Sequence, residues 1–396
     1  MADAAPRHGD LLRRAEAELA RVVSDVPLPE PRVGFLDAPA EDFARFFLPS
    51  RPSEDLRRSL RRSEGFWTRT FARELRFLRP ALRIRPETLH RVASHSASAG
   101  APGTVATRWG RSHNWSGAVI SARDGMTFRS VSAAWTVPEA RRPTDAAAVA
   151  SRGGPPGGEW KASVWIGLDG FRRGSLSLPQ MGTASEIGPG GAARAYLWVQ
   201  WWVRGAFFGE VEVGNFEVSP GDRVHAFVEA FTRTRVGFTA VNVAQGTAAT
   251  VVWDAGVAVT STAGPVELSA SDTGDRALTP VEGRHAVWCV ERPSVMPTDA
   301  EIAAGAQPHQ AEAYRLPDIG GGVFEEALAL MRPPGAGANR SVERDLTAAR
   351  YIRMVDPRPT ARPPTVALLA SPDIPRARGR LKVGQTETSQ PLPPGA

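Results

Sequence analysis

The segment Ala195-Tyr-Leu-Trp-Val-Gln-Trp-Trp-Val203 has the composition of a β-strand, because aromatic and β-branched residues occupy six of its nine positions. Comparable short runs rich in Val, Thr, Phe and Trp recur further along the chain, separated by Gly, Pro, Asp and Asn. No helical pattern comes between them. This arrangement predicts an antiparallel β-sandwich of two sheets. The other predicted strands are residues 224–231, 237–243, 250–253 and 285–290.

The predicted β-sandwich extends from about residue 109 to residue 372. Ten of the 11 tryptophans lie between Trp109 and Trp288, within this part of the chain. Residues 93–108 are rich in Ser, Ala, Gly and Thr, which predicts a linker. Residues 373–396 have few apolar side chains, which predicts a disordered tail. The sequence therefore predicts one β domain with a linker before it and a tail after it.

Residues 1–92 differ from the rest in being helical and basic. Apolar residues recur at helical spacing behind Asp10, a candidate N-cap. Residues 53–78 predict a second helix, with apolar side chains on one side and arginines mostly on the other. Between Arg51 and Arg91, 12 arginines stand against five acidic residues, a net charge of +7. Because the whole chain carries +6, the basic excess belongs to this region.

Cys289 is the only cysteine, which excludes an intrachain disulfide and a cysteine-rich zinc site. We expect no metal ion and no cofactor. The first 32 residues hold no apolar run of signal-peptide length, and no segment reaches the ~18 apolar residues of a membrane-spanning helix. As written, the sequence predicts a cytoplasmic protein, and secretion would follow only if the start were misassigned.

Six fragments of the β region occur in a characteristic order. They are Asn114-Trp-Ser-Gly-Ala-Val, Trp135-Thr-Val-Pro, Ser163-Val-Trp-Ile-Gly-Leu-Asp-Gly170, Leu178-Pro-Gln-Met-Gly-Thr183, Trp198-Val-Gln-Trp-Trp202 and Ala286-Val-Trp-Cys-Val-Glu291. Together they make residues 114 to about 370 resemble the glutamic peptidase (eqolisin) family, acid endopeptidases built on a lectin-like β-sandwich. The resemblance implies a peptide or protein as substrate or ligand.

In that family a glutamine and a glutamate hold the attacking water between them. The glutamate removes a proton, while the glutamine amide binds the water and stabilises the oxyanion of the tetrahedral intermediate. Gln180 matches the family glutamine. The resemblance also implies that Trp165 and Asp169 shape the site. The remaining residues expected to line a substrate groove are Trp198, Gln200 and Trp288.

The family glutamate is missing from this sequence. The family pattern is Ala-Glu-Trp with a second Glu three residues after the Trp, so Val287 stands at the catalytic position and Glu291 matches the second, non-catalytic glutamate. Gln200 stands where many members carry Glu. Valine cannot accept a proton, and loss of a general base typically costs ~10²- to 10⁴-fold in rate. We therefore expect hydrolysis to be impaired or lost.

His285 and Glu291 are candidates for a displaced base. Alternate residues of a strand share a face, so both point the same way as Val287. His285 lies one pleat repeat away, roughly 7 Å along the strand. Alternatively, these side chains are packed or hydrogen-bonded groups without a catalytic role. Two functions thus remain open: impaired peptide-bond hydrolysis, and non-catalytic binding of peptide or glycan.

Three interpretations of the basic N-terminal region remain open. Family members carry a basic pro-segment at this place, so residues 1–92 resemble such a segment or an internal cap on the site. A contact with nucleic acid or an anionic membrane is the second interpretation, of which we expect nucleic acid least. A solvated helix face is the third. The arginines concerned are Arg57, Arg58, Arg61, Arg62, Arg69 and Arg73.

Overall fold

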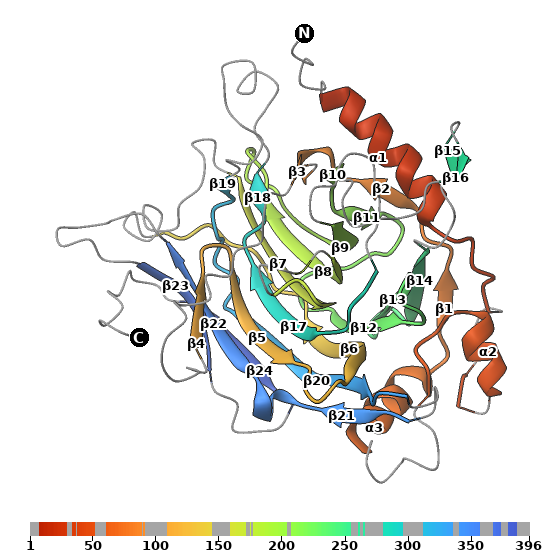
Figure 1. Cartoon of the computed structure of the whole chain (residues 1–396). Coiled ribbons are helices and arrows are strands. Elements are labelled where there is room, and N and C mark those ends of the chain that lie inside the picture. Colours follow the sequence, from red (N-terminus) through yellow and green to blue (C-terminus); the bar gives the residue numbers. More distant parts are fainter. Residues whose placement is uncertain are drawn as a thin grey trace.

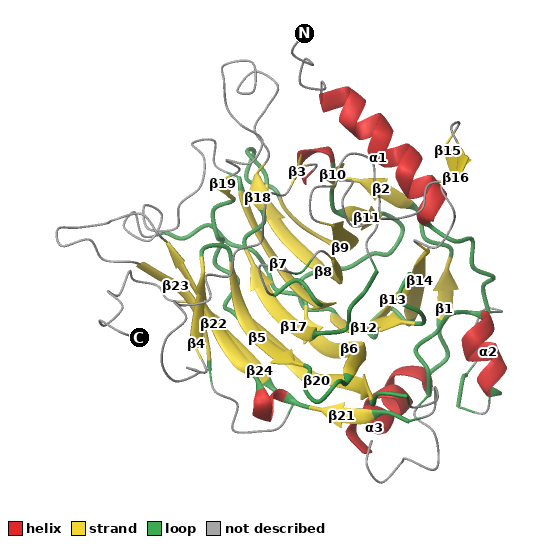
Figure 2. Cartoon of the chain, viewed as in Figure 1, coloured by secondary structure: helices red, strands yellow, loops and turns green. Residues whose placement is uncertain are grey.

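The protein is mainly β, as the computed structural model shows (Figures 1 and 2). Three α-helices and 24 numbered β-strands occur in the described residues, which confirms the predicted fold class at this level. The described residues are 8–29, 34–36, 38–51, 61–88, 90–91, 109–144, 159–171, 175, 177–203, 207–254, 260–261, 264–265, 280–295, 312–335, 340–356, 367–373 and 379–385. The predicted linker, residues 93–108, lies outside them.

The helices all belong to the N-terminal region. They are α1 (His8–Val22), α2 (Ala40–Arg45) and α3 (Arg61–Phe71). The predicted helix over residues 53–78 differs from the structure, because α3 ends at Phe71 and β1 (Arg76–Leu78) follows. The reason is tertiary: the backbone of β1 is hydrogen-bonded to a neighbouring strand, which satisfies its polar groups without a helix. None of these helices combines the length and the apolar character needed to cross a membrane.

Eighteen strands are hydrogen-bonded into one mixed sheet. Its first stretch runs, neighbour to neighbour, through β2, β11, β9, β8, β7, β17, β5 and β22, with antiparallel pairing throughout. The bounds are β2 (Leu82–Ile84), β11 (Val211–Val213), β9 (Ala193–Val203), β8 (Ser177–Ile187), β7 (Trp160–Leu168), β17 (His285–Glu291), β5 (Trp115–Ser121) and β22 (Arg350–Asp356).

The second stretch runs through β24, β20, β6, β12, β13, β14 and β1. β23 (Ala367–Pro372) pairs with β22 and with β24 and so joins the two stretches, which makes one sheet where we predicted two. Two pairings are parallel, β1 with β14 and β4 (Trp109–Ser112) with β22. The other bounds are β24 (Leu381–Gln385), β20 (Gly322–Arg332), β6 (Thr127–Thr136), β12 (Arg223–Ala230), β13 (Arg235–Asn242), β14 (Thr247–Asp254) and β21 (Val342–Arg344), which pairs with β20.

Three two-stranded pairs complete the described β structure. They are β3 (His90–Arg91) with β10 (Phe207–Phe208), β15 (Thr260–Ser261) with β16 (Gly264–Pro265), and β18 (Ser294–Val295) with β19 (Glu312–Ala313). β24 lies inside the predicted disordered tail, residues 373–396, and the structure differs from that prediction because buried Leu381 and Val383 anchor this strand in the sheet. Residues 374–378 and 386–396 of the tail lie outside the described part.

The two stretches of sheet pack against each other around the main hydrophobic core. The indole Nε1 of Trp288 in β17 donates to the backbone oxygen of Ser132 in β6 (3.0 Å). The indole Nε1 of Trp135 in β6 donates to Thr183 Oγ1 in β8 (2.9 Å). Each tryptophan fills the core with its rings and satisfies its N–H on the facing stretch. The other face of the first stretch is therefore turned away from the main core.

The N-terminal region completes both ends of the sheet. β1 adds a parallel strand to β14, and β2 adds an antiparallel strand to β11. The link between β1 and β2 is held by Asn215, whose Oδ1 accepts from the backbone N of Ala81 (2.9 Å) and whose Nδ2 donates to the backbone O of Arg79 (2.8 Å). Exposed strand edges invite pairing with other chains. Two consecutive short strands of the N-terminal region thus cover both.

A second core of aromatic side chains fixes α3 to the second stretch of the sheet. Phe227 of β12 lies 5.0 Å, centroid to centroid, from Phe66 and 5.8 Å from Phe71, both of α3. His225 lies below the helix, with its Nδ1 2.8 Å from Thr70 Oγ1. Burial, together with nearby arginines, lowers the pKa of His225 to about 3, so its ring is neutral at physiological pH. The remaining aromatic members are Phe35, Phe43, Trp67 and Phe77.

Candidate functional site

Gln180 and Val287 lie in one row of directly opposed residues across the first stretch of the sheet. Gln200 of β9 is opposite Gln180 of β8, Gln180 is opposite Gly167 of β7, and Gly167 is opposite Val287 of β17. Val119 of β5 continues the row beyond Val287. Opposed residues of neighbouring strands point to the same face. We call this the glutamine row, and the face that carries it the site face.

Gly167 lies between Gln180 and Val287 in the row and places no side chain between them. A Cβ at this position would lie 2.9 Å from the backbone oxygen of Pro179 and 3.0 Å from the Cβ of Gln180, closer than such atoms approach. Glycine therefore lets the side chain of Gln180 lie over the backbone of β7. The backbones of Gln180 and Val287 are two strand spacings apart, about 10 Å. The register thus places these two positions on one face of the sheet, on either side of β7.

The amide of Gln180 is only partly satisfied. Its Nε2 donates to Gln200 Oε1 (2.7 Å), and both side chains are buried. Gln180 Oε1 is also buried and makes no hydrogen bond to any described group. Buried polar atoms without a partner are rare and call for an explanation. This oxygen is the acceptor of the amide that remains without a partner among the described residues.

The tryptophans predicted to line the site divide between two faces. Trp165 and Trp198 lie on the site face, in the next row along the strands, on either side of Gly182. Trp288 follows Val287 and therefore points into the main core, where its indole bonds to Ser132. The structure therefore places this indole in the main core, on the face opposite to the glutamine row. Trp165 and Trp198 are buried, so they form the floor beside the glutamine row.

Glu291 is a buried carboxyl group at the far end of β17. Its Oε1 accepts from Asn114 Nδ2 and its Oε2 from Trp165 Nε1, both at 2.7 Å. Burial raises the pKa of Glu291 to about 8, so the group holds a proton at neutral pH. It lies four residues beyond Val287, about 13 Å along the strand. Glu291 orients Trp165 rather than meeting Gln180.

The raised pKa of Glu291 predicts a pH-dependent stability. Between its ordinary pKa of 4.5 and about 8, the folded protein keeps a proton that the unfolded chain releases. The free energy of unfolding should therefore fall as pH rises through this window, by about 1.4 kcal/mol per pH unit from this group. Urea unfolding between pH 4 and 9 measures it, with Glu291→Gln as the control that lacks the slope. Equal slopes in both proteins would show that Glu291 does not hold this proton in the folded protein.

Asp169 and His285 lie at the start of β17, the end opposite to Glu291. Asp169 is buried and has a φ of 65°, at the turn where β7 ends. Its carboxylate accepts from the backbone nitrogens of residues 282–285, at 2.6 to 3.3 Å. Burial raises the pKa of Asp169, and these four donors oppose that rise. The carboxylate thereby fixes the entry into β17 and, with it, the position of Val287.

Replacing Asp169 with alanine should lower the free energy of unfolding by at least about 3 kcal/mol, because four backbone N–H groups lose their acceptor. Chemical denaturation measures the loss. Asp124→Ala is the matched control: Asp124 also has a positive φ, 55°, but is exposed. A loss at Asp169 no larger than at Asp124 would show that the carboxylate does not hold this turn.

His285 is buried in the row beside Val287. Its ring makes an edge contact with the ring of Phe171, with 5.5 Å between centroids. Phe171, in the loop after β7, is partly exposed and also contacts Trp115 (6.2 Å). The predicted distance of one pleat repeat from Val287 agrees with the register. The imidazole is thus near the glutamine row, but it is packed under an aromatic ring.

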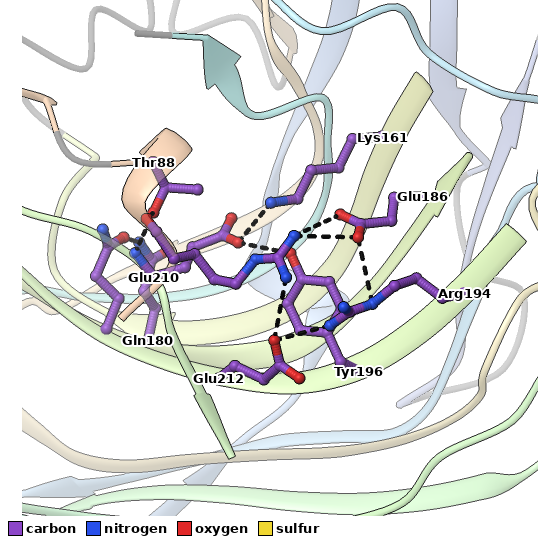
Figure 3. A network of polar contacts seen from close by, with 10 residues as sticks. Thr88, Lys161, Gln180, Glu186, Arg194, Tyr196, Glu210 and Glu212 are labelled. Carbon is purple, nitrogen blue, oxygen red and sulfur yellow. Dashed lines mark hydrogen bonds and ion pairs between the residues drawn. The ribbon is translucent and has the colours of Figure 1, made fainter. Parts of the chain in front are cut away.

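The N-terminal region reaches the site face through a polar network (Figure 3). Arg85 donates to Glu186 (3.1 Å) and Glu212 (3.3 Å) and lies over the ring of Tyr196. The hydroxyl of Thr88, in the 3₁₀ turn η2 (Pro86–Thr88), accepts from the backbone N of Glu210 (2.7 Å). Residues 85–88 therefore lie across the site face.

Glu210 connects this network to the glutamine row. β11 pairs Val211 with Val199, so Glu210 comes next to Gln200, and Figure 3 shows it near Gln180. Its Oε2 accepts from Lys161 Nζ (2.7 Å) and Tyr196 OH (3.1 Å). The sequence analysis missed Lys161, Glu210 and Arg85. A signal existed for Lys161, one of only two lysines in the chain and placed inside an aromatic strand.

The arginines of α3 are partly neutralised by acidic side chains of the sheet domain. Arg62 pairs with Asp345 (2.9 Å), and Arg69 pairs with Glu326. Arg57 and Arg58 of the predicted basic helix lie outside the described residues. This pairing favours an internal packing role for the helix over a contact with nucleic acid.

Residues 113–304 match the sequence model of a family described as the Peptidase A4 family. No curated protein matches the chain. The match begins just before Asn114 and contains Gln180, Val287 and Glu291. It therefore covers every residue of the glutamine row.

Several solved structures are similar to the chain. Scytalido-glutamic peptidase with a transition state analog inhibitor has 16% identity over 69% of this chain and 98% of its own, with a TM-score of 0.44. SCP-B, a member of the eqolisin family in complex with the tripeptide Ala-Ile-His, has 15% identity over the same shares and a TM-score of 0.42. Aspergilloglutamic peptidase from Aspergillus niger has 15% identity over 57% of this chain and 99% of its own, with a TM-score of 0.35.

Proposed function

Residues 113–304 make this chain a member of the Peptidase A4 family, and we propose that it binds peptides on the site face while hydrolysing them poorly or not at all. The observation that carries the proposal is Val287 in the glutamine row. The position that faces Gln180 across Gly167 has no group that accepts a proton. A water beside Gln180 would lack a base, at a cost of ~10²- to 10⁴-fold in rate.

Hydrolysis with a displaced base is the second candidate function. His285 favours it by its place one pleat repeat from Val287, and a histidine base would work near neutral pH. Against it, His285 is packed beneath Phe171 and Glu291 lies about 13 Å along the strand from the row. Among the described residues, the amide of Gln180 bonds to Gln200 and to neither of these side chains.

Incubation of the purified protein with a denatured protein substrate between pH 2 and 8 separates the two candidates. Our proposal expects binding of peptides with no cleavage above background. Cleavage that is greatest near neutral pH and is abolished by both His285→Gln and Gln180→Ala would establish the second candidate instead. Binding of glycans but not of peptides would show that the ligand is a glycan.

We further infer that the N-terminal region is a built-in cap of this domain and that the two stretches of the sheet are the two layers of the family's sandwich. Support comes from residues 85–88, which lie across the site face, and from the tryptophans that bond between the stretches.

A further inference from the structure

Arg350 extends the glutamine row at its other end. It lies in β22 directly opposite Val119 of β5, which is opposite Val287. The row therefore reads Gln180, Gly167, Val287, Val119 and Arg350, with four strand spacings, about 19 Å, between the backbones of its ends. One end offers an amide and the other a guanidinium. The side chains between them are apolar.

The guanidinium of Arg350 is placed against an aromatic ring at the accessible end of the site face. It lies 5.7 Å from the centroid of Phe171, and its Nη2 makes a long contact of 3.5 Å with the backbone oxygen of Trp109. Its Nε is buried and makes no hydrogen bond to the described part of the chain. Arg350 and Phe171 are partly exposed, whereas Val119 and Val287 are buried.

No described carboxylate neutralises Arg350. By contrast, Arg85 and Arg194 on the same face each pair with Glu186 and Glu212. The titratable groups near Arg350 do not supply the charge. His285 carries no negative charge, the carboxylate of Asp169 accepts from four backbone donors, and Glu291 is protonated at neutral pH.

Valine at position 287 adds to the excess of positive charge at Arg350. A glutamate there would place a negative charge two strand spacings from Arg350 and compete with an incoming anion. With valine at this position, no carboxylate lies between Gln180 and Arg350 in the row. A planar guanidinium with free donors binds a carboxylate in a bidentate manner, and a neighbouring ring provides a surface for an apolar side chain.

We propose that Arg350 and Phe171 form a subsite for the C-terminal carboxylate of a bound peptide, with the last side chain of the peptide packed on Phe171. The inference rests on the proposed peptide-binding function and names the end of the peptide that this face recognises. It makes the protein a receptor for free peptide ends, the kind of group that proteolysis creates.

The test compares pairs of peptides that differ only at the C-terminus. N-terminally fluorescein-labelled pentapeptides ending in Leu, Val or Phe are prepared as free acids and as amides, and fluorescence anisotropy measures their binding to the full-length protein at pH 7. The free acids should bind about 10- to 100-fold more tightly, as expected for a charge-assisted pair. Arg350→Gln should remove this difference, and Arg350→Lys should keep part of it.

Arg353→Gln is the matched control. Arg353 lies on the same strand and over an aromatic ring, 4.1 Å from the centroid of Trp109, but on the opposite face. It should keep the full preference for free acids. Near-UV circular dichroism verifies that each variant is folded.

Three outcomes would overturn the inference. Equal binding of acids and amides to the original protein removes the subsite but leaves the peptide-binding function intact. An equal loss of preference in Arg353→Gln shows a general effect of charge. Absence of binding for every peptide removes the proposed function together with the subsite.

Discussion

Replacing Val287 with glutamate is expected to raise the rate of peptide-bond hydrolysis at acid pH by at least about 10²-fold. The new carboxyl would face Gln180 across Gly167, the place where the glutamine row lacks a proton acceptor. Gln180 Oε1 is already free of other bonds among the described groups and can orient a water. Cleavage of a denatured protein between pH 2 and 8 measures the gain.

Val287→Gln is the matched control for this variant, because glutamine has the size and polarity of glutamate but cannot serve as the base. Gln180→Ala added to Val287→Glu should return the rate to background. All variants are assayed as the full-length protein, so residues 85–88 lie across the site face in each of them. A folded Val287→Glu protein no faster than Val287→Gln would show that position 287 does not act with Gln180.

Removing residues 1–91 is expected to abolish the folded, soluble protein. The deletion exposes the edges of β11 and β14 and uncovers Phe227 and its neighbours in the second core. Each core aromatic side chain that is lost contributes roughly 1.5–3 kcal/mol, and a whole domain is stable by only about 5–15 kcal/mol. Size-exclusion chromatography and circular dichroism of the expressed fragment measure the outcome.

Cutting the chain within residues 93–108 tests whether the N-terminal region is held by its contacts with the sheet alone, without the covalent connection. The two fragments should stay together and keep the melting transition of the intact protein, because the strand pairs and the aromatic core are unaffected. A soluble fragment 109–396 with a cooperative melt would show instead that the N-terminal region is a removable segment.

Five strands could be predicted because their signal is local. Alternating or continuous apolar residues between turn formers mark β9, β12, β13, β14 and β17 in the sequence itself, and the structure places them within three residues of the predicted bounds. Two of the strands that were not predicted show a dependence on a distant partner. Residues 76–78 have a helical pattern and residues 381–385 have a polar context, yet each pairs with a strand far away in the chain.

The candidate site could be predicted only in part. The fragments around Gln180 and Val287 identified the two positions, and the strand alternation placed His285 and Glu291 on the same face. Trp288 was predicted to line the groove, and its indole lies in the main core. Arg350, Arg85 and Glu210 were missed because each comes from a segment with no motif and reaches the site face only through pairing.

By itself, the sequence determined the β class, the positions of five strands and the presence of valine, not glutamate, at position 287. These follow from side-chain composition and from spacing within a few residues. Only the tertiary structure decided that Val287 faces Gln180 across a glycine, that Arg350 ends the same row, and that the N-terminal region closes both sheet edges. The physical reason is that strand register depends on hydrogen bonds between segments up to hundreds of residues apart, which no local pattern specifies.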